Sequence, residues 1–253
     1  MNGLRIGLTF LTRVPLATEA PGPGDWARAV RWFPLAGAVV ATFGMAALIV
    51  GSFALTPLVG AVGAVGAMVW MTGALHVDGF SDCLDGMHCN GDAEKRLRVM
   101  HDPAAGAVGA AGTALMLLAK VVLLAACVEN GTGAAALWAA VVCARAFLPF
   151  EIAFCAPATP GKGLFARLAL EVGAKDALWA VLLAALIVAP VIIVVPAAAG
   201  GLLVGLAGAG AATIAWQASW RARIGGINGD VVGAAVELRE LVLLAAMGTP
   251  WLA

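Results

Sequence analysis

Residues 75–91 read LHVDGFSDCLDGMHCNG and contain three aspartates, Asp78, Asp82 and Asp85, spaced i, i+4 and i+7. On a helix this spacing puts all three carboxylates on one face. Neighbouring carboxylates about 6 Å apart repel by roughly 2–3 kcal/mol per pair at an effective dielectric near 20. No Lys or Arg lies between Arg31 and Lys95 to relieve that repulsion locally. Clustered hard oxygen ligands are what Mg²⁺ or Mn²⁺ bind together with phosphate oxygens, so the stretch predicts a divalent-metal phosphate site.

The composition is that of an integral membrane protein. The chain has 253 residues, of which 62% are hydrophobic and 12% charged, whereas soluble domains carry about 25% charged residues. Residues 58–75, directly before the aspartates, are uncharged, which places the predicted site at a membrane rim. A net charge of zero argues against a nucleic-acid partner. Five cysteines without a repeated CxxC spacing indicate reduced thiols, and not a disulfide framework or structural zinc.

Hydropathy predicts an all-α, polytopic helical bundle with about seven spanning helices and short interfacial helices. A spanning helix needs about 20 mostly apolar residues, and the sequence offers such stretches at 34–55, 58–77, 105–128, 133–156, 177–196, 198–217 and 231–250. No flexible linker divides the chain, so residues 1–253 are expected to form one transmembrane catalytic domain. The N-terminal stretch has Arg5 and Arg13 between apolar residues, which favours a short interfacial or buried helix over a cleavable signal. This helix either orients the protein or lines the site.

Basic residues fall on one side of the predicted spans. Twelve of the fifteen Lys and Arg residues lie in the N-terminus, residues 95–98, the 157–176 loop and the 220–230 loop, and none lies in the short loops between them. The positive-inside rule therefore puts these segments, and the aspartates, in the cytoplasm. We expect a multi-pass protein of the cytoplasmic (inner) membrane whose active site faces the cytoplasm.

The remaining basic residues are Lys120, Arg145 and Arg239. Lys120 and Arg145 fall in the middle of predicted spans, where an ionised group costs about 2.5–3.5 kcal/mol. Arg145 is six residues before Glu151 on the same span, and Lys120 can reach a carboxylate across the bundle. These residues form either internal ion pairs that join helices or cationic contacts to a phosphate.

Three more cytoplasmic segments hold candidate site residues, namely residues 92–102, 161–171 and 223–237. Residues 92–102 resemble a short amphipathic surface helix whose basic face contacts lipid headgroups or an anionic substrate. Asp102, at its end, is either a helix-boundary residue or a fourth metal ligand. In GKGLFARLALE, residues 161–171, Lys162 is either a phosphate contact or only a determinant of topology.

The stretch RIGGINGDVVGAAVE, residues 223–237, is a glycine-rich loop whose amides can approach a phosphate. Asp230 serves either as the N-cap of the last helix or as a metal and phosphate ligand with the first aspartates. Glu237 lies two turns further along and on the same face as Asp230.

The segment TGALHVDGFSDCLDG (72–86) closely resembles the signature of the cobalamin synthase family, the adenosylcobinamide-GDP ribazoletransferases. FLTRVP (10–15), WFPLAG (32–37) and GGINGDVVGAAVE (225–237) resemble that family's other landmarks in the same order, so the resemblance covers essentially the whole chain. It implies a Mg²⁺-dependent inner-membrane enzyme of late cobalamin biosynthesis. Such an enzyme joins adenosylcobinamide-GDP to α-ribazole, or to α-ribazole 5′-phosphate, and releases GMP.

The expected site combines residues from these segments. Asp78, Asp82 and Asp85 are the catalytic residues, and they bind Mg²⁺ together with Asp230. The expected substrate-binding residues are His76, Asn228, Arg13, Lys162 and Glu237. Beyond the substrates and the lipid bilayer, a second copy of the chain or other cobalamin-assembly enzymes are expected partners.

One segment departs from the resembled family. Where relatives have a basic residue followed by Asp, Ser, Arg, Ile and Gly, this chain has His101, Asp102, Pro103, Ala104, Ala105 and Gly106. The phosphate contact of the missing Arg must then come from Lys95, Arg96, Arg98 or Lys162. The alternatives are a CDP-alcohol-type phosphotransferase, which has a similar DG…D…DG pattern but an Ala-Arg pair absent here, and a membrane transporter.

Overall fold

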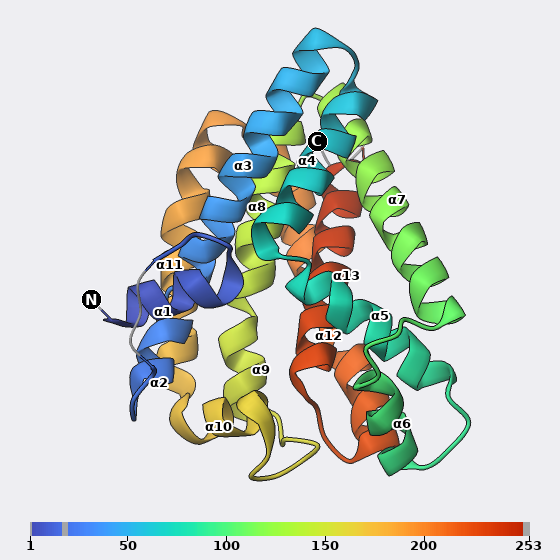
Figure 1. Cartoon of the computed structure of the whole chain (residues 1–253). Coiled ribbons are helices and arrows are strands. Elements are labelled where there is room, and N and C mark those ends of the chain that lie inside the picture. Colours follow the sequence, from blue (N-terminus) through green and yellow to red (C-terminus); the bar gives the residue numbers. More distant parts are fainter. Residues whose placement is uncertain (1, 17–19, 250–253) are drawn as a thin grey trace.

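The structure, a computed structural model, describes residues 2–16 and 20–249, which form thirteen helices and no strand (Figure 1). The first seven are α1 (Asn2–Leu11), α2 (Asp25–Val30), α3 (Phe33–Ala54), α4 (Pro57–Thr72), α5 (Leu75–His88), α6 (Ala93–Met100) and α7 (Ala107–Glu129). The others are α8 (Gly133–Ala146), α9 (Leu148–Phe154), α10 (Gly163–Glu171), α11 (Ala174–Val194), α12 (Ala198–Ile224) and α13 (Gly229–Met247).

Five helical segments among the described residues are long and apolar enough to span a membrane. They are α3, α7, α8 continued by α9, α11 and α12, and the bent pair α4–α5 makes a sixth if it is counted as one span. The all-α, polytopic architecture is thereby confirmed. We treat the five segments as the membrane-spanning ones, and α5 and α13 lie outside that set.

The chain bends sharply between α4 and α5. The sequence predicts a span over 58–77, but α4 ends at Thr72, and α5 leaves it at an angle of 91°. Gly73 and Ala74 both adopt left-handed backbone conformations, with φ of 62° and 61°. Their N–H groups donate to the carbonyls of Trp70 and Val69, which satisfies the end of α4. The bend turns the aspartate-bearing helix away from the direction of the preceding one.

The last helix, α13, lies at the centre of the bundle, beside α5, α7, α8 and α12 (Figure 1). The sequence predicts a seventh span over 231–250, but α13 contains Asp230, Glu237, Arg239 and Glu240 and is not among the segments apolar enough to span on their own. Most of its residues are nevertheless buried. This helix carries its charges into the protein interior and not toward lipid.

Those interior charges form ion pairs. The Lys120 ammonium lies 2.5 Å from a carboxylate oxygen of Glu237 and 2.5 Å from one of Glu240, and Arg145 lies 2.6 Å from the other oxygen of Glu240. The predicted partner of Lys120 across the bundle is thus confirmed. Arg145 pairs with α13 and not with Glu151 of its own span. Of the two alternatives for Lys120 and Arg145, the structure shows the internal ion pair.

A second buried pair lies next to the first group. Arg239 donates to Glu151 at 2.9 Å, and Gln217 donates to the other oxygen of that carboxylate at 2.8 Å. The Arg239 guanidinium also lies 5.4 Å from the centre of the Phe147 ring. Three cations and three carboxylates therefore neutralise one another inside the bundle, which limits the cost of burying them.

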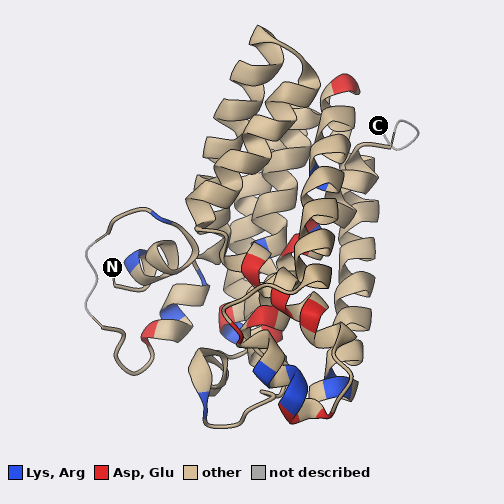
Figure 2. Cartoon of the chain, turned by 45° about the vertical axis from the view of Figure 1, so that its right-hand side comes forward, with Lys and Arg blue, Asp and Glu red and all other residues tan. Residues whose placement is uncertain are grey.

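Most other charges gather at one end of the bundle, the end that carries α6 and α10 (Figures 1 and 2). Two apolar clusters form the core. One lies among α3, α4, α7, α8 and α11. The other surrounds the charged end and includes Phe33, Phe80, Trp220 and Ile227. The predicted site residues of α5 and α13 lie beside this second cluster.

Candidate active site

An acidic cavity of about 270 Å³ opens between α5, α13 and the segment that follows α6. It is lined by Asp78, Ser81, Asp82, Met100, His101, Asp102, Pro103, Ala105 and Asp230. Four of these residues are carboxylates, and no Lys or Arg is among the described residues of the lining. The sequence predicts three of the four carboxylates as metal ligands and offers Asp102 as a fourth.

Gly79 brings the two acidic helices together. A Cβ at this position would lie 2.9 Å from the Cα of Asp230, closer than real Cβ contacts come, so only glycine permits this approach of α5 to the start of α13. The close packing places Asp230 beside Asp78 and Asp82, although they are about 150 residues apart in the chain.

Asn228, and not Asp230, caps α13. The Asn228 side-chain oxygen accepts from the Val231 N–H at 3.0 Å, and its amide donates to Asp230 at 2.9 Å. Asp230 is the second residue of the helix, where the positive end of the helix dipole favours a negative charge. The capping alternative for Asp230 is therefore wrong, and its carboxylate lines the cavity.

The loop before α13 is held by backbone contacts to the segment after α9. Ile227 donates to the Ala156 carbonyl at 3.0 Å, and its own carbonyl accepts from Ala158 at 2.8 Å. A Cβ at Gly226 would lie 2.6 Å from the Ala158 nitrogen, so glycine is required for this approach. The glycines of this loop thus serve at least one structural purpose, the fixed start of α13.

The cavity concentrates negative charge. Burial and the neighbouring carboxylates Asp78, Asp230 and Asp85 raise the pKa of Asp82 to about 7. Burial likewise raises the pKa of Asp230, and the nearby His101 acts in the opposite direction. A cation in the cavity would relieve this repulsion.

Asp85 is not among the residues that line the cavity, and its carboxylate contacts the start of α7. Its two oxygens accept from the backbone N–H groups of Gly106 and Gly109 at 2.7 and 2.8 Å. The first N–H groups of a helix have no partner within the helix, so Asp85 satisfies them and joins α5 to α7. The regular i, i+4, i+7 spacing holds, but the third carboxylate makes different contacts from the first two.

The lining offers oxygen donors that suit Mg²⁺, an ion that retains several waters and usually takes one or two carboxylates plus substrate phosphates. Among the residues that the structure describes, no three His, Cys, Asp or Glu side chains are arranged as a complete metal-binding group. The donor set of Asp78, Asp82, Asp102 and Asp230 fits an ion that shares its coordination with phosphate and water.

The expected substrate-binding residues are placed differently. His76 is buried and, with Asp230, lines a second, apolar cavity. Arg13 is exposed beside the α4–α5 bend, where its backbone N–H donates to the Met71 carbonyl at 2.7 Å. Lys162 is exposed in the loop before α10, and Glu237 pairs with Lys120 in the interior.

The expected surface helix is present as α6, and its basic residues contact protein groups. Arg96 donates to the carbonyls of Gly86 and Met87, Arg98 pairs with Glu94, and Lys95 donates to the Asn90 carbonyl.

Two polar residues of the acidic cavity, Ser81 and His101, were not predicted from the sequence. Two features of the sequence could have indicated them. The Ser81 hydroxyl lies one residue before Asp82, and the His101 imidazole lies in the segment 101–106, which departs from the family pattern.

Comparison with known proteins identifies the family of this chain. The family model described as cobalamin-5-phosphate synthase matches residues 3–248. The chain belongs to that family. No solved structure matches the chain.

Curated relatives align over nearly the whole chain. A protein of Brevibacillus brevis is 30% identical, with all of both chains covered. One of Pseudomonas aeruginosa strain UCBPP-PA14 is 34% identical over 98% of each chain, and one of Ralstonia nicotianae is 33% identical over 96% of this chain and 93% of the relative. All three are named adenosylcobinamide-GDP ribazoletransferase. The resemblance found in the sequence is thus confirmed.

Proposed function

We propose that this protein is a membrane transferase of cobalamin biosynthesis that joins adenosylcobinamide-GDP to α-ribazole, or to α-ribazole 5′-phosphate, and releases GMP. Membership of the family and the names of full-length relatives support this activity. The observation that carries it is the cavity in which Asp78 and Asp82 of the signature helix meet Asp230 of the C-terminal motif. Two motifs that are remote in sequence thus supply one site.

The reaction requires one bond to form and one to break at a phosphorus atom. A ribose hydroxyl of the ribazole forms a bond to the phosphorus that carries the corrinoid side chain. The bond from that phosphorus to the bridging oxygen of the pyrophosphate breaks, and GMP leaves with that oxygen. The hydroxyl proton passes to a carboxylate, for which the cavity offers Asp78, Asp82 and Asp230.

Within this proposal, Asp78, Asp82 and Asp230 would hold Mg²⁺, and Asp102 is the fourth carboxylate of the lining. When bound, the ion neutralises negative charge that develops on the phosphate oxygens. Asp85 acts from outside the cavity by fixing α7 against α5. His101 and Ser81 are the remaining polar side chains of the lining that can contact phosphate oxygens.

We further propose that the protein lies in the cytoplasmic (inner) membrane with the acidic cavity on the cytoplasmic side. The concentration of Lys and Arg at the end that carries α6 and α10 supports this orientation (Figure 2). The cavity is then open to nucleotide-bearing substrate from the cytosol. We also propose that the protein associates with a second copy of itself or with other cobalamin-assembly enzymes.

The test is GMP release by the purified full chain from adenosylcobinamide-GDP and α-ribazole. We expect GMP and the joined corrinoid product in equal amounts with Mg²⁺, and neither product after chelation. Release of GMP without α-ribazole would indicate a hydrolase. Absence of GMP release with every ribazole form and every divalent cation would overturn the proposed activity.

A further inference from the structure

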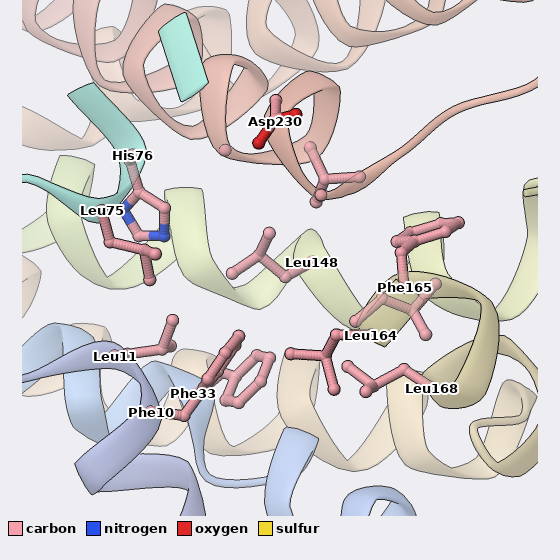
Figure 3. Close-up of a pocket in the computed structure, with 14 residues that line it drawn as sticks. Phe10, Leu11, Phe33, Leu75, His76, Leu148, Leu164, Phe165, Leu168 and Asp230 are labelled. Carbon is pink, nitrogen blue, oxygen red and sulfur yellow. The ribbon is translucent and has the colours of Figure 1, made fainter. Parts of the chain in front are cut away.

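A second cavity, of about 190 Å³, is lined by Asp230, which also lines the acidic cavity (Figure 3). This volume is more than ten times the roughly 15 Å³ that admits one water molecule. Its wall is built mainly from large apolar side chains of α1, α3, α9 and α10, among them Phe10, Phe33, Leu148, Leu164, Phe165 and Leu168. The wall on the opposite side comes from α5 and α13.

His76 and Asp230 are the two residues with polar side chains among the described residues of this lining. His76 is 4% exposed, and Figure 3 shows its ring directed into the cavity. Neither ring nitrogen of His76 has a hydrogen-bond partner among the described residues. Nδ1 is fully buried, so Nε2 is the nitrogen that a ligand in the cavity can reach. A buried polar group without a protein partner favours a ligand that supplies one.

The imidazole of His76 is the hydrogen-bonding group that α5 presents to this cavity. A neutral imidazole carries one N–H donor and one acceptor nitrogen. The cavity therefore presents a single imidazole hydrogen-bonding group within a largely apolar wall.

The chemistry of the wall discriminates among the parts of the two substrates. Guanine has an edge of several donors and acceptors, which leucine and phenylalanine side chains would leave unpaired. The corrin ring is too large for a space of about 190 Å³. The dimethylbenzimidazole of α-ribazole is flat and apolar, and outside the glycosidic bond it has one nitrogen that accepts a hydrogen bond.

We infer that this apolar cavity binds the two-ring base of the ribazole substrate, with His76 donating to the free ring nitrogen. The inference rests on the proposed function. Asp230 lines both cavities, so a base held here places its ribose at Asp230 and next to the acidic cavity. His76 and Asp78, two residues apart on α5, then serve opposite ends of one substrate.

The first experiment fills the cavity. Leu148→Phe places a larger side chain in the wall, and we expect the KM for α-ribazole to rise by roughly tenfold or more while the KM for adenosylcobinamide-GDP stays within about twofold. The matched control is Leu118→Phe on α7, where Leu118 is exposed on the outside of the bundle. An equal change in both KM values, or no change in either, overturns the inference.

Gly233→Ala gives a second, smaller obstruction if Leu148→Phe does not fold. Its added Cβ would lie 3.5 Å from the His76 Cα and 3.7 Å from the His76 Cδ2, which is ordinary van der Waals contact. We expect a smaller rise in the KM for α-ribazole in the same direction. A KM change confined to adenosylcobinamide-GDP would contradict the assignment.

The second experiment tests the hydrogen bond from His76. His76→Phe keeps a flat ring but removes the donor, so the enzyme should lose its preference for the α-riboside of benzimidazole over that of indole, which lacks the acceptor nitrogen. We expect roughly a tenfold preference in the unchanged protein and none in the variant. The same preference in both proteins would remove His76 from base recognition.

Equilibrium dialysis of α-ribazole against the full chain in detergent separates the two proposals. If no GMP is released but α-ribazole binds and Leu148→Phe abolishes binding, the cavity assignment stands and the proposed reaction fails. If GMP is released and Leu148→Phe leaves both binding and KM unchanged, the reaction stands and the cavity assignment fails.

Discussion

Gly79 of α5 and Asp230 of α13 meet backbone to backbone, and this contact joins the two halves of the acidic cavity. We predict that Gly79→Ala separates the helices, because its Cβ would lie 2.9 Å from both the Cα and the carbonyl oxygen of Asp230. Activity should fall by roughly a hundredfold, since small displacements of catalytic groups cost about that factor.

Gly66→Ala on α4 is the matched control, because a Cβ there meets nothing within 4 Å. Both proteins should remain folded by size-exclusion chromatography, with GMP release as the readout. Normal turnover by Gly79→Ala would show that this contact does not position the site.

Asp82 and Asp85 should respond differently to the same substitution. Asp82→Asn removes a charge from the cavity, so GMP release should fall by roughly a hundredfold or more, with an unchanged or higher melting temperature because repulsion is relieved. Asp85→Asn weakens the acceptor of two N–H groups at the start of α7 and should lower stability by about 1 kcal/mol. Thermal unfolding in detergent, measured beside activity, separates the two roles. Identical profiles for the two variants would refute that separation.

The capping role of Asn228 and the cavity role of Asp230 can be separated by mutation. Asn228→Ala removes the cap of α13 and should cost about 1 kcal/mol of stability. Asp230→Ser leaves that cap in place, so stability should change little while GMP release is largely lost. An active Asp230→Ser enzyme would restrict the metal site to the α5 aspartates.

The interior ion pairs should be intolerant of single changes. Glu240→Gln leaves Lys120 and Arg145 with one carboxylate between them and should destabilise the protein by about 3–5 kcal/mol. The double variant Lys120→Met with Glu237→Met removes one charge of each sign and should be much closer to the parent in melting temperature. A single variant that is as stable as the double one would show that the pairs contribute little.

The orientation is testable by labelling intact cells with a membrane-impermeant thiol reagent. A Cys89→Ser background removes the one cysteine that is not buried. A cysteine at position 130, between α7 and α8, should be labelled, and a cysteine at position 92, between α5 and α6, should not. Labelling at position 92 from outside would reverse the proposed orientation.

Hydropathy and charge were sufficient to predict the all-α membrane bundle, most helix positions and the helical aspartate cluster. The bend at residues 73–74 could not be predicted, because it depends on a left-handed conformation at Ala74 that alanine rarely adopts. A hydropathy window therefore continues the fourth helix through it. Asn228 and Asp230 both suit the N-cap position, so only the structure shows that Asn228 is the residue that caps α13.

Other features depend on partners that no local pattern identifies. Glu237 follows Asp230 at a helical spacing of seven, yet tertiary packing pairs it with Lys120 of α7. Asp85 binds backbone groups more than 20 residues away. The apolar cavity combines residues of six helices, so the sequence shows its leucines and phenylalanines only as core residues.

The buried charges of α13 also bear on the order in which the helices assemble. Glu237, Arg239 and Glu240 would be costly to bury in this helix alone, since an unpaired buried charge is strongly destabilising. Their partners Lys120, Arg145 and Glu151 are all synthesised earlier and lie on helices that precede α13. Biogenesis must therefore end with the last helix entering a bundle that already holds its counter-charges. A chain that stops before residue 229 would leave three ionised groups unneutralised, and cellular quality control would be expected to degrade it.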